Sequence, residues 1–241
     1  MRIGIYGGTF NPPHQGHMLA ARIALEALDL DRLILIPTAQ PPHKDLPAGS
    51  PTAEDRLAMT NIAADNLLWP AISVSDLELR RAGRSYTADT IEALHRQYPD
   101  DELWFLMGAD MFLSLQNWHE PERIMACAGI AGFARAADQE EELERQAELL
   151  RQKYQARVKV LRLHDTAEIS STQLREMLLQ DKGWEYLVPA VRGYILMHGL
   201  YGTHADLGHL DLEDLRACSY SMVKAKRLAH IRGTEEEAVR L

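Results

Sequence analysis

The feature that most constrains the fold of this chain is a regular alternation of short apolar runs with segments of helical periodicity. Residues 2–6 are rich in β-branched and aromatic side chains and end at Gly7 and Gly8, which predicts a strand entering a tight loop. Apolar residues then recur at helical spacing to about Asp29. Further strands are expected at 33–37, 72–76, 102–107, 130–134 and 158–163, with helices at 53–68, 87–97 and 139–153.

This alternation predicts βαβ units, and hence an α/β fold: a Rossmann-like parallel sheet with helices on both faces. Sheets of this kind bind their ligands beyond the carboxyl ends of the strands, so candidate site residues should directly follow strands. The alternation stops at about Gly202. We therefore expect a main domain over residues 1–202 and a small helical extension over residues 203–241.

The composition limits the kinds of partner that this chain can have. The formal net charge is −9, from 35 acidic and 26 basic residues, which disfavours sequence-independent binding to nucleic acid. No apolar run reaches the ~18–20 residues of a membrane-spanning helix, and the N-terminus lacks the features of a signal peptide. The two cysteines, Cys127 and Cys218, are far apart and in no metal-binding spacing. We therefore expect a cytoplasmic protein that binds neither nucleic acid nor membranes.

The first predicted strand leads into the loop GGTFNPPHQGH, residues 7–17. Gly7, Gly8 and Thr9 follow the strand directly, and glycine lets backbone N–H groups approach a phosphate closely. The loop then enters the N-terminus of a helix, where free N–H groups favour an anion. His14 and His17 are three residues apart, so they lie on one face and can contact one ligand. A metal-binding histidine pair and two surface histidines are the alternatives to a phosphate site.

The segment ISSTQLR, residues 169–175, is the second candidate phosphate site. Ser170, Ser171 and Thr172 precede a predicted helix, and one hydroxyl at that position is the usual helix cap. Three hydroxyls in succession exceed what capping requires. Arg175 lies one helical turn beyond Ser171, where its guanidinium can reach the same anion.

Several other residues occupy positions suited to a second substrate. Arg135 follows a predicted strand directly, and Lys44 lies in the loop after the second strand. Tyr86 and Thr87 precede a helix whose free N–H groups can bind a carboxylate. Trp118 stands in a polar run, which favours a platform for a flat ring over a core position.

The loop GGTFNPPHQGH and the segment ISSTQLR together resemble the two signature motifs of the HxGH nucleotidyltransferase superfamily, in the same order. The resemblance extends from Met1 to about Tyr201 and is greatest with the bacterial nicotinate mononucleotide adenylyltransferases. It implies that the chain transfers AMP from ATP to nicotinate mononucleotide, forming deamido-NAD and pyrophosphate in NAD biosynthesis. It also implies that Mg²⁺ accompanies ATP, although the sequence identifies no metal ligands.

The resemblance assigns roles to particular residues. The implied catalytic residues are His14, His17 and Arg175. The residues implied in ATP binding are Gly7, Gly8, Thr9, Phe10, His17, Gly108, Asp110, Ile169, Ser170, Ser171, Thr172 and Arg175. The residues implied in acceptor binding are Lys44, Ser85, Tyr86, Thr87, Trp118 and Arg135. Within this last set, Lys44 and Arg135 would engage the acceptor phosphate, and Trp118 would pack on the nicotinate ring.

Other functions fit parts of this pattern. The alternatives are another HxGH adenylyl- or cytidylyltransferase, such as a phosphopantetheine adenylyltransferase, an aminoacyl-tRNA synthetase fragment, and a nucleotide sensor without catalysis. Tyr86, Thr87 and Trp118 disfavour the first, and the presence of ISSTQLR in place of a KMSKS-type loop disfavours the second. The intact His17 and Arg175 disfavour the third. A homo-oligomer is left open.

The expected extension has a pattern of its own. A rough apolar stripe predicts helices packed on the main domain or on a second subunit. It includes Leu210, Leu212, Leu215, Cys218 and Met222, and continues with Val223, Leu228, Ile231, Val239 and Leu241. Thr234 and Glu237 are spaced as a capping box, which would begin one more helix. KRLAHIRGTEEEAVRL, residues 226–241, resembles the opening helices of an HD-type metal phosphohydrolase, with His230 in place of the first metal ligand. Since no His-Asp pair follows in the sequence, we expect this segment to bind no catalytic metal.

Overall fold

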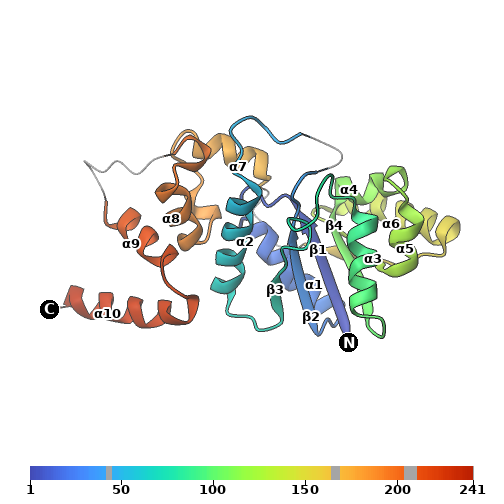
Figure 1. Cartoon of the computed structure of the whole chain (residues 1–241), viewed down its shortest axis with the longest axis horizontal. Coiled ribbons are helices and arrows are strands. Elements are labelled where there is room, and N and C mark those ends of the chain that lie inside the picture. The colour runs from blue at the N-terminus through green and yellow to red at the C-terminus, as the bar shows by residue number, and fades with distance from the viewer. Residues whose placement is uncertain (42–44, 164–168, 204–210, 241) are drawn as a thin grey trace.

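The structure is a computed structural model that describes residues 1–41, 45–163, 169–203 and 211–240 (Figure 1). Its centre is a six-stranded sheet of order β3-β2-β1-β4-β5-β6, in which all paired neighbours are parallel. The strands are β1 (Arg2–Gly8), β2 (Arg32–Pro37), β3 (Ile72–Val74), β4 (Glu102–Gly108), β5 (Gly129–Ala134) and β6 (Val158–Arg162). The strand order reverses its direction between β1 and β4, so a topological switch point lies at the centre of the sheet.

Helices cover both faces of this sheet, which confirms the predicted α/β fold. One face is covered by α1 (Gln15–Ala27), α2 (Ala53–Leu67), α7 (Ser171–Leu178) and α8 (Pro189–Met197). The other face is covered by α3 (Thr87–Gln97), α4 (Ala109–Ser114), α5 (Pro121–Cys127) and α6 (Ala137–Tyr154). Short 3-10 turns lie at Leu115–Asn117, Trp184–Tyr186, Leu200–Gly202 and Ala225–Arg227.

The central strands are apolar on both sides because both sides of the sheet are buried. In β1, Tyr6 packs on the side of α1 and α2, whereas Ile3 and Ile5 pack on the side of α3 and α6. In β2, Leu33 packs on the side of α1 and α2, whereas Ile34 packs on the side of α3 and α6. Full burial of one such side chain stabilises the fold by about 1.5–3 kcal/mol, so these runs fix the sheet between its two helical layers.

Helix α2 begins where the sequence predicts it. The Asp55 N–H donates to Oγ1 of Thr52, and the Thr52 N–H donates to Oδ2 of Asp55, both at 3.1 Å, as a capping box requires. The short helices α4 and α5 were not predicted, because 6 and 7 residues give too few turns for a periodic pattern. The strands and helices whose ranges were predicted are all present, with ends at most two residues from the prediction.

The extension forms α9 (Leu212–Ser221) and α10 (Leu228–Arg240), which lie at one end of the molecule (Figure 1). Helix α9 packs tightly on α8, because a Cβ added at Gly193 would lie 1.9 Å from the carbonyl oxygen of Ala217. Arg192 of α8 forms ion pairs with Glu213 and Asp214 of α9, at 3.1 and 2.6 Å. The first helix of the extension is therefore fixed to the main domain.

One expectation about the extension is wrong, and the predicted apolar stripe is buried only in part. Leu228 of the stripe is buried, whereas Leu212, Leu215 and Met222 are 62, 48 and 71% exposed within the chain, and Leu210 lies outside the described residues. Packing of the stripe on a second subunit stays a prediction. The buried apolar residues of α9, α10 and the turn between them are Ala217, Tyr220, Ala225 and Leu228. Thr234 begins no helix, because it lies inside α10 and its hydroxyl donates to the His230 carbonyl at 2.9 Å. Along the described part of the chain, no helix combines the length and apolar character needed to cross a membrane.

Candidate active site

The loop after β1 leaves the carboxyl edge of the sheet beside β4, at the switch point. Gly8 lets this loop fold back closely, because a Cβ there would lie 3.3 Å from the Phe10 ring. Phe10 itself has a left-handed backbone with a φ of 45°, a conformation that is strained for a non-glycine residue. Its ring packs edge-on against Tyr6 and His17, with centroids 5.7 and 5.1 Å away. An aromatic cluster therefore holds the loop in this conformation.

His14 and His17 lie against each other at the start of α1. Their ring centroids are 3.8 Å apart, and the His14 N–H donates to Nδ1 of His17 at 3.2 Å. Because Nδ1 of His17 accepts a hydrogen bond, the neutral ring carries its proton on Nε2, which is left as a donor. Gly16 permits this arrangement, since a Cβ there would lie 3.0 Å from Nδ1 of His14. The HQGH spacing therefore produces a compact pair of rings with one defined tautomer.

Both histidines are held in the neutral form. Burial, and then the charge of Arg135, lowers the pKa of His14 to about 4. Burial, then the neighbouring His14 and Arg135, lowers the pKa of His17 well below its ordinary value. Nδ1 of His14 is buried and has no hydrogen-bond partner among the described residues. A buried polar atom of this kind beside a cation is suited to a polar, anionic ligand.

The ISSTQLR segment begins α7 and contacts the first loop. Ser170 is the helix cap, because its hydroxyl accepts a hydrogen bond from the Gln173 N–H at 3.2 Å. Capping therefore uses only one of the three successive hydroxyls. The next hydroxyl, of Ser171, donates to the Pro12 carbonyl of the first loop at 3.4 Å. Ile169, directly before the cap, is buried in the core on the side of α1.

Arg175 joins the two motifs. Its Nη1 donates to the Asn11 carbonyl at 2.8 Å, and its Nη2 donates to Oγ1 of Thr172 at 3.0 Å. Asn11 is itself buried, and its side-chain oxygen accepts from the Tyr201 hydroxyl at 2.8 Å. The guanidinium is thus held at the loop that carries the histidine pair, so two segments far apart in the sequence form one region.

Arg56 is a buried residue of this region that sequence reasoning missed. Its side chain is 0% exposed and donates to the carbonyls of Thr9, Thr38 and Ala39, at 2.8, 2.6 and 3.0 Å. It therefore ties the loop after β1 to the loop after β2. The sequence contained one indication, because Arg56 lies on the same buried face of α2 as Met59, where an apolar residue is expected.

Two other strand ends border this region. Arg135 directly follows β5, and its charge reaches both histidines. A recess of about 330 Å³ is lined by Arg135, Gln139 and Gln173, and so joins the end of β5 to α7. Gly108 and Asp110, at the end of β4, are exposed. They share the carboxyl edge of the sheet with the histidines, but no described contact joins them to the pair.

The predicted acceptor residues lead into α3. Ser85 is buried, and its hydroxyl accepts from the Gln40 N–H at 3.4 Å. The Tyr86 carbonyl accepts from the Thr90 hydroxyl at 3.3 Å. Thr87 is the first residue of α3, so its N–H has no acceptor within the helix. That N–H lies on the opposite side of the peptide bond from the Tyr86 carbonyl, and so faces away from Thr90.

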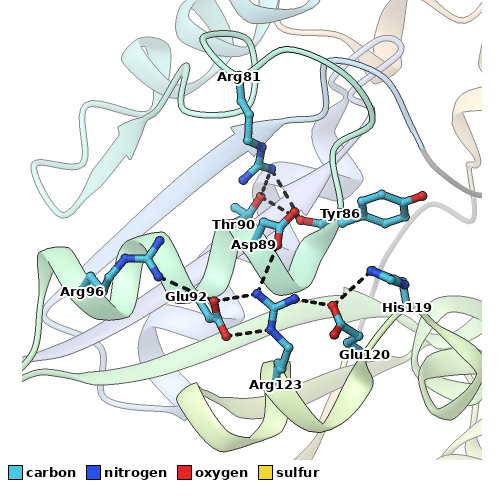
Figure 2. Close-up of polar contacts among 9 residues, drawn as sticks. All are labelled: Arg81, Tyr86, Asp89, Thr90, Glu92, Arg96, His119, Glu120 and Arg123. Atoms are coloured by element: carbon cyan, nitrogen blue, oxygen red, sulfur yellow. Dashed lines mark hydrogen bonds and ion pairs between the residues drawn. The ribbon is translucent and has the colours of Figure 1, made fainter.

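Trp118 and His119 lie in the turn before α5. The ring of His119 packs on that of Tyr86, with centroids 4.4 Å apart (Figure 2). Nε1 of Trp118 donates to Oγ of Ser114 at 3.2 Å, and its ring packs edge-on against Phe105. Trp118 is thus partly buried. It packs against the core, as a core tryptophan does, but it keeps some exposure, as a platform for a flat ring requires. His119 was not predicted as a site residue, and the predicted Lys44 lies outside the described residues.

Comparison with known proteins identifies the family. Residues 5–177 match the cytidylyltransferase-like family. The chain is 38% identical over 202 residues to the "Probable nicotinate-nucleotide adenylyltransferase" of Lachnoclostridium phytofermentans, covering 83% of this chain and 98% of that protein. It is 39% identical over 203 residues to the protein of the same name from Thermus thermophilus, covering 83% of this chain and 100% of that protein. The chain belongs to the nicotinate-nucleotide adenylyltransferase family.

The fold of this family member also resembles that of more distant solved structures. One is "Plasmodium falciparum nicotinic acid mononucleotide adenylyltransferase complexed with NaAD", with a TM-score of 0.68 and 18% sequence identity. The match covers 84% of this chain and 98% of that chain. At this identity the likeness concerns the fold alone, and it agrees with the nucleotidyltransferase architecture predicted from the two motifs.

Proposed function

We propose that this chain transfers the adenylyl group of ATP to nicotinate mononucleotide, forming deamido-NAD and pyrophosphate. Family membership supports this reaction. The observation that carries it is the junction of the two motifs, where Nη1 of Arg175 donates to the carbonyl of Asn11 at 2.8 Å. That junction joins a guanidinium to the loop of His14 and His17, and histidine and guanidinium donors together suit a polyphosphate.

The proposed reaction needs no nucleophile from the protein. An oxygen of the acceptor's 5′-phosphate attacks the α-phosphorus of ATP in line. The bond between that phosphorus and the bridging oxygen to the β-phosphate breaks, and pyrophosphate leaves with the electron pair. Such transfers depend mainly on positioning and charge stabilisation. We assign His14 and the Nε2–H of His17 to the reacting phosphate, and Ser171, Thr172 and Arg175 to the departing pyrophosphate.

Mg²⁺ enters this proposal as part of the MgATP substrate. No group of three His, Cys, Asp or Glu side chains that could hold a metal ion occurs within the described ranges. Mg²⁺ keeps several waters and binds through one or two carboxylates together with substrate phosphates, so the donor set fits an ion delivered with ATP. Asp110, exposed after β4, is assigned either to the ribose of ATP or to the ion.

We assign acceptor recognition to the start of α3 and the turn before α5. The N–H of Thr87 lacks an acceptor within its helix, which supports a contact with the carboxylate of the nicotinate ring. The partly buried ring of Trp118 supports packing against that ring. Arg135 and Lys44 are assigned to the acceptor phosphate. A helix N-terminus favours an anion over a neutral group, so this arrangement favours nicotinate over nicotinamide mononucleotide.

Incubation of the purified chain with MgATP and one acceptor at a time tests the proposal. Pyrophosphate release and deamido-NAD formation are expected with nicotinate mononucleotide, and much slower release with nicotinamide mononucleotide. Turnover with phosphopantetheine alone would identify a different HxGH transferase. Nucleotide binding without turnover of any acceptor would identify a sensor.

We also propose that residues 1–202 form the catalytic domain and residues 203–241 a helical extension attached to it. The close approach of α8 and α9 at Gly193 supports a fixed attachment. A cytoplasmic location, a homo-oligomer and an HD-type origin of the extension stay predictions from the sequence.

A further inference from the structure

Arg123 lies in a cluster of carboxylates beside the proposed acceptor site (Figure 2). Its Nε and Nη2 donate to the two carboxylate oxygens of Glu92, each at 2.7 Å. Nη2 also donates to Oδ1 of Asp89 at 3.2 Å, and Nη1 contacts Oε2 of Glu120. One guanidinium therefore engages two carboxylates from α3 and a third from the residue before α5.

This cluster adjoins the residues assigned to the acceptor. Oε2 of Glu120 lies 3.1 Å from Nε2 of His119, whose ring packs on Tyr86. Asp89 belongs to the first turn of α3, two residues after Thr87. Glu120 has a left-handed backbone with a φ of 50°, and its ion pair with Arg123 helps to hold the strained turn that follows Trp118.

The charges of the cluster bear directly on the choice of acceptor. Hydrogen bonds from Arg123 lower the pKa of Glu92, which keeps this carboxylate ionised at neutral pH. Without a cation among them, Asp89, Glu92 and Glu120 would repel an acceptor that carries its own carboxylate. A neutral amide in the same place would feel no such repulsion, because a dipole interacts far more weakly than a charge.

We propose that Arg123 is a positioning residue that sets acceptor selectivity, because it offsets part of the negative charge of Asp89, Glu92 and Glu120 beside the place where an anionic ring substituent binds. The inference rests on the proposed function and concerns the choice between the carboxylate and amide forms of the acceptor. Arg123 acts through the carboxylates that it holds and through the turn of His119, without a contact of its own to the substrate.

The test measures kcat/KM for nicotinate mononucleotide divided by kcat/KM for nicotinamide mononucleotide. Arg123→Met should lower this ratio about fivefold, the scale for one unit charge acting across ~8 Å at an effective dielectric constant of about 40. The KM for ATP should stay unchanged. Arg96→Met is a matched control, since Arg96 pairs with the same Glu92 at 3.6 Å but is 71% exposed. This control should change the ratio by less than about twofold.

Two further variants separate charge from structure. Glu92→Gln leaves the arginine in place and should raise the ratio, and Arg123→Met with Glu92→Gln should recover part of what Arg123→Met loses. If Arg123→Met does not fold, Glu92→Gln still shows whether the ratio of the two kcat/KM values rises when negative charge is removed. Equal falls in kcat/KM for both acceptors, or an active wild type whose ratio moves in neither variant, would overturn the inference and leave the proposed function intact. A wild type that adenylates neither mononucleotide would overturn both.

Discussion

The phosphate side and the acceptor side of the proposed site are built in different ways. On the phosphate side, the neutral His14, the half-buried His17 and the fully buried Arg56 are held by backbone groups and aromatic rings. On the acceptor side, Arg123 and Glu92 are 30 and 28% exposed and are held by ion pairs. Buried hydrogen-bonded groups are costly to disturb, whereas partly exposed ion pairs contribute less and are screened by salt. The fold therefore fixes the phosphate side firmly and leaves acceptor choice adjustable.

The largest expected effect tests the rigidity of the phosphate side. Arg56→Met should lower the free energy of unfolding by about 3–5 kcal/mol, because it removes a fully buried side chain that donates to three partly buried carbonyls. Urea unfolding measures this change. Arg80→Met, at a position 77% exposed, is the control and should have little effect. A loss below about 1 kcal/mol for Arg56→Met would remove the contrast between the two sides.

A somewhat smaller effect is expected on the chemistry. His17→Ala should lower kcat about 10²–10³-fold, the scale for losing one preorganised donor to a developing charge. The KM for the acceptor should change little, and the thermal midpoint should fall only modestly, because His17→Ala removes one ring and one hydrogen bond while Tyr6 and Phe10 stay packed on each other. Steady-state kinetics and a thermal melt check this, with the exposed His95→Ala as control. Near-normal turnover would show that His17 has no part in the reaction.

Acidification should reveal the burial of the histidine pair in the ligand-free protein. Since the pKa of His14 falls from 6.5 to about 4 on folding, the unfolded chain takes up the proton first as the pH drops. The stability supplied by the neutral ring is complete above pH 6.5 and is lost as the pH falls toward 4, with about 2 kcal/mol lost at pH 5. Urea unfolding at pH 7 and pH 5 should therefore show a smaller loss for His14→Asn than for the wild type. Identical losses would mean that His14 is not held neutral.

The smallest effect concerns the acceptor side alone. Trp118→Ala should raise the KM for nicotinate mononucleotide about tenfold, the scale of one aromatic stacking contact, and leave the KM for ATP unchanged. Trp118→Phe should keep most of the affinity, because it retains a ring. Initial rates with each substrate varied in turn give both constants. A parallel rise in the KM for ATP would show that the two sides of the site are not independent.

The sheet could be predicted from the sequence because burial on both faces turns each central strand into an apolar run, as in β1 and β2. The phosphate motifs could be found because their spacing is local: the histidines are one turn apart, and so are Ser171 and Arg175.

Arg56 could not be assigned, because its partners Thr9 and Thr38 lie in loops that only the folded sheet brings to α2. Arg123 looks like any surface arginine until α3 and α5 are adjacent. The prediction of a helix start at Thr234 was wrong because a hydroxyl inside a helix can also donate to the carbonyl four residues earlier.

The hydrogen bond between Arg175 and Asn11 joins residues that are 164 positions apart in the sequence. This separation determines when, during synthesis, the bond can first form. A ribosome adds roughly 5–20 residues each second, so roughly 8–33 s pass between the appearance of the first motif and that of its arginine. During this interval the nascent chain carries both histidines but lacks the group that closes the loop around them. The two phosphate motifs can therefore hold a nucleotide together only once the growing chain extends beyond Arg175.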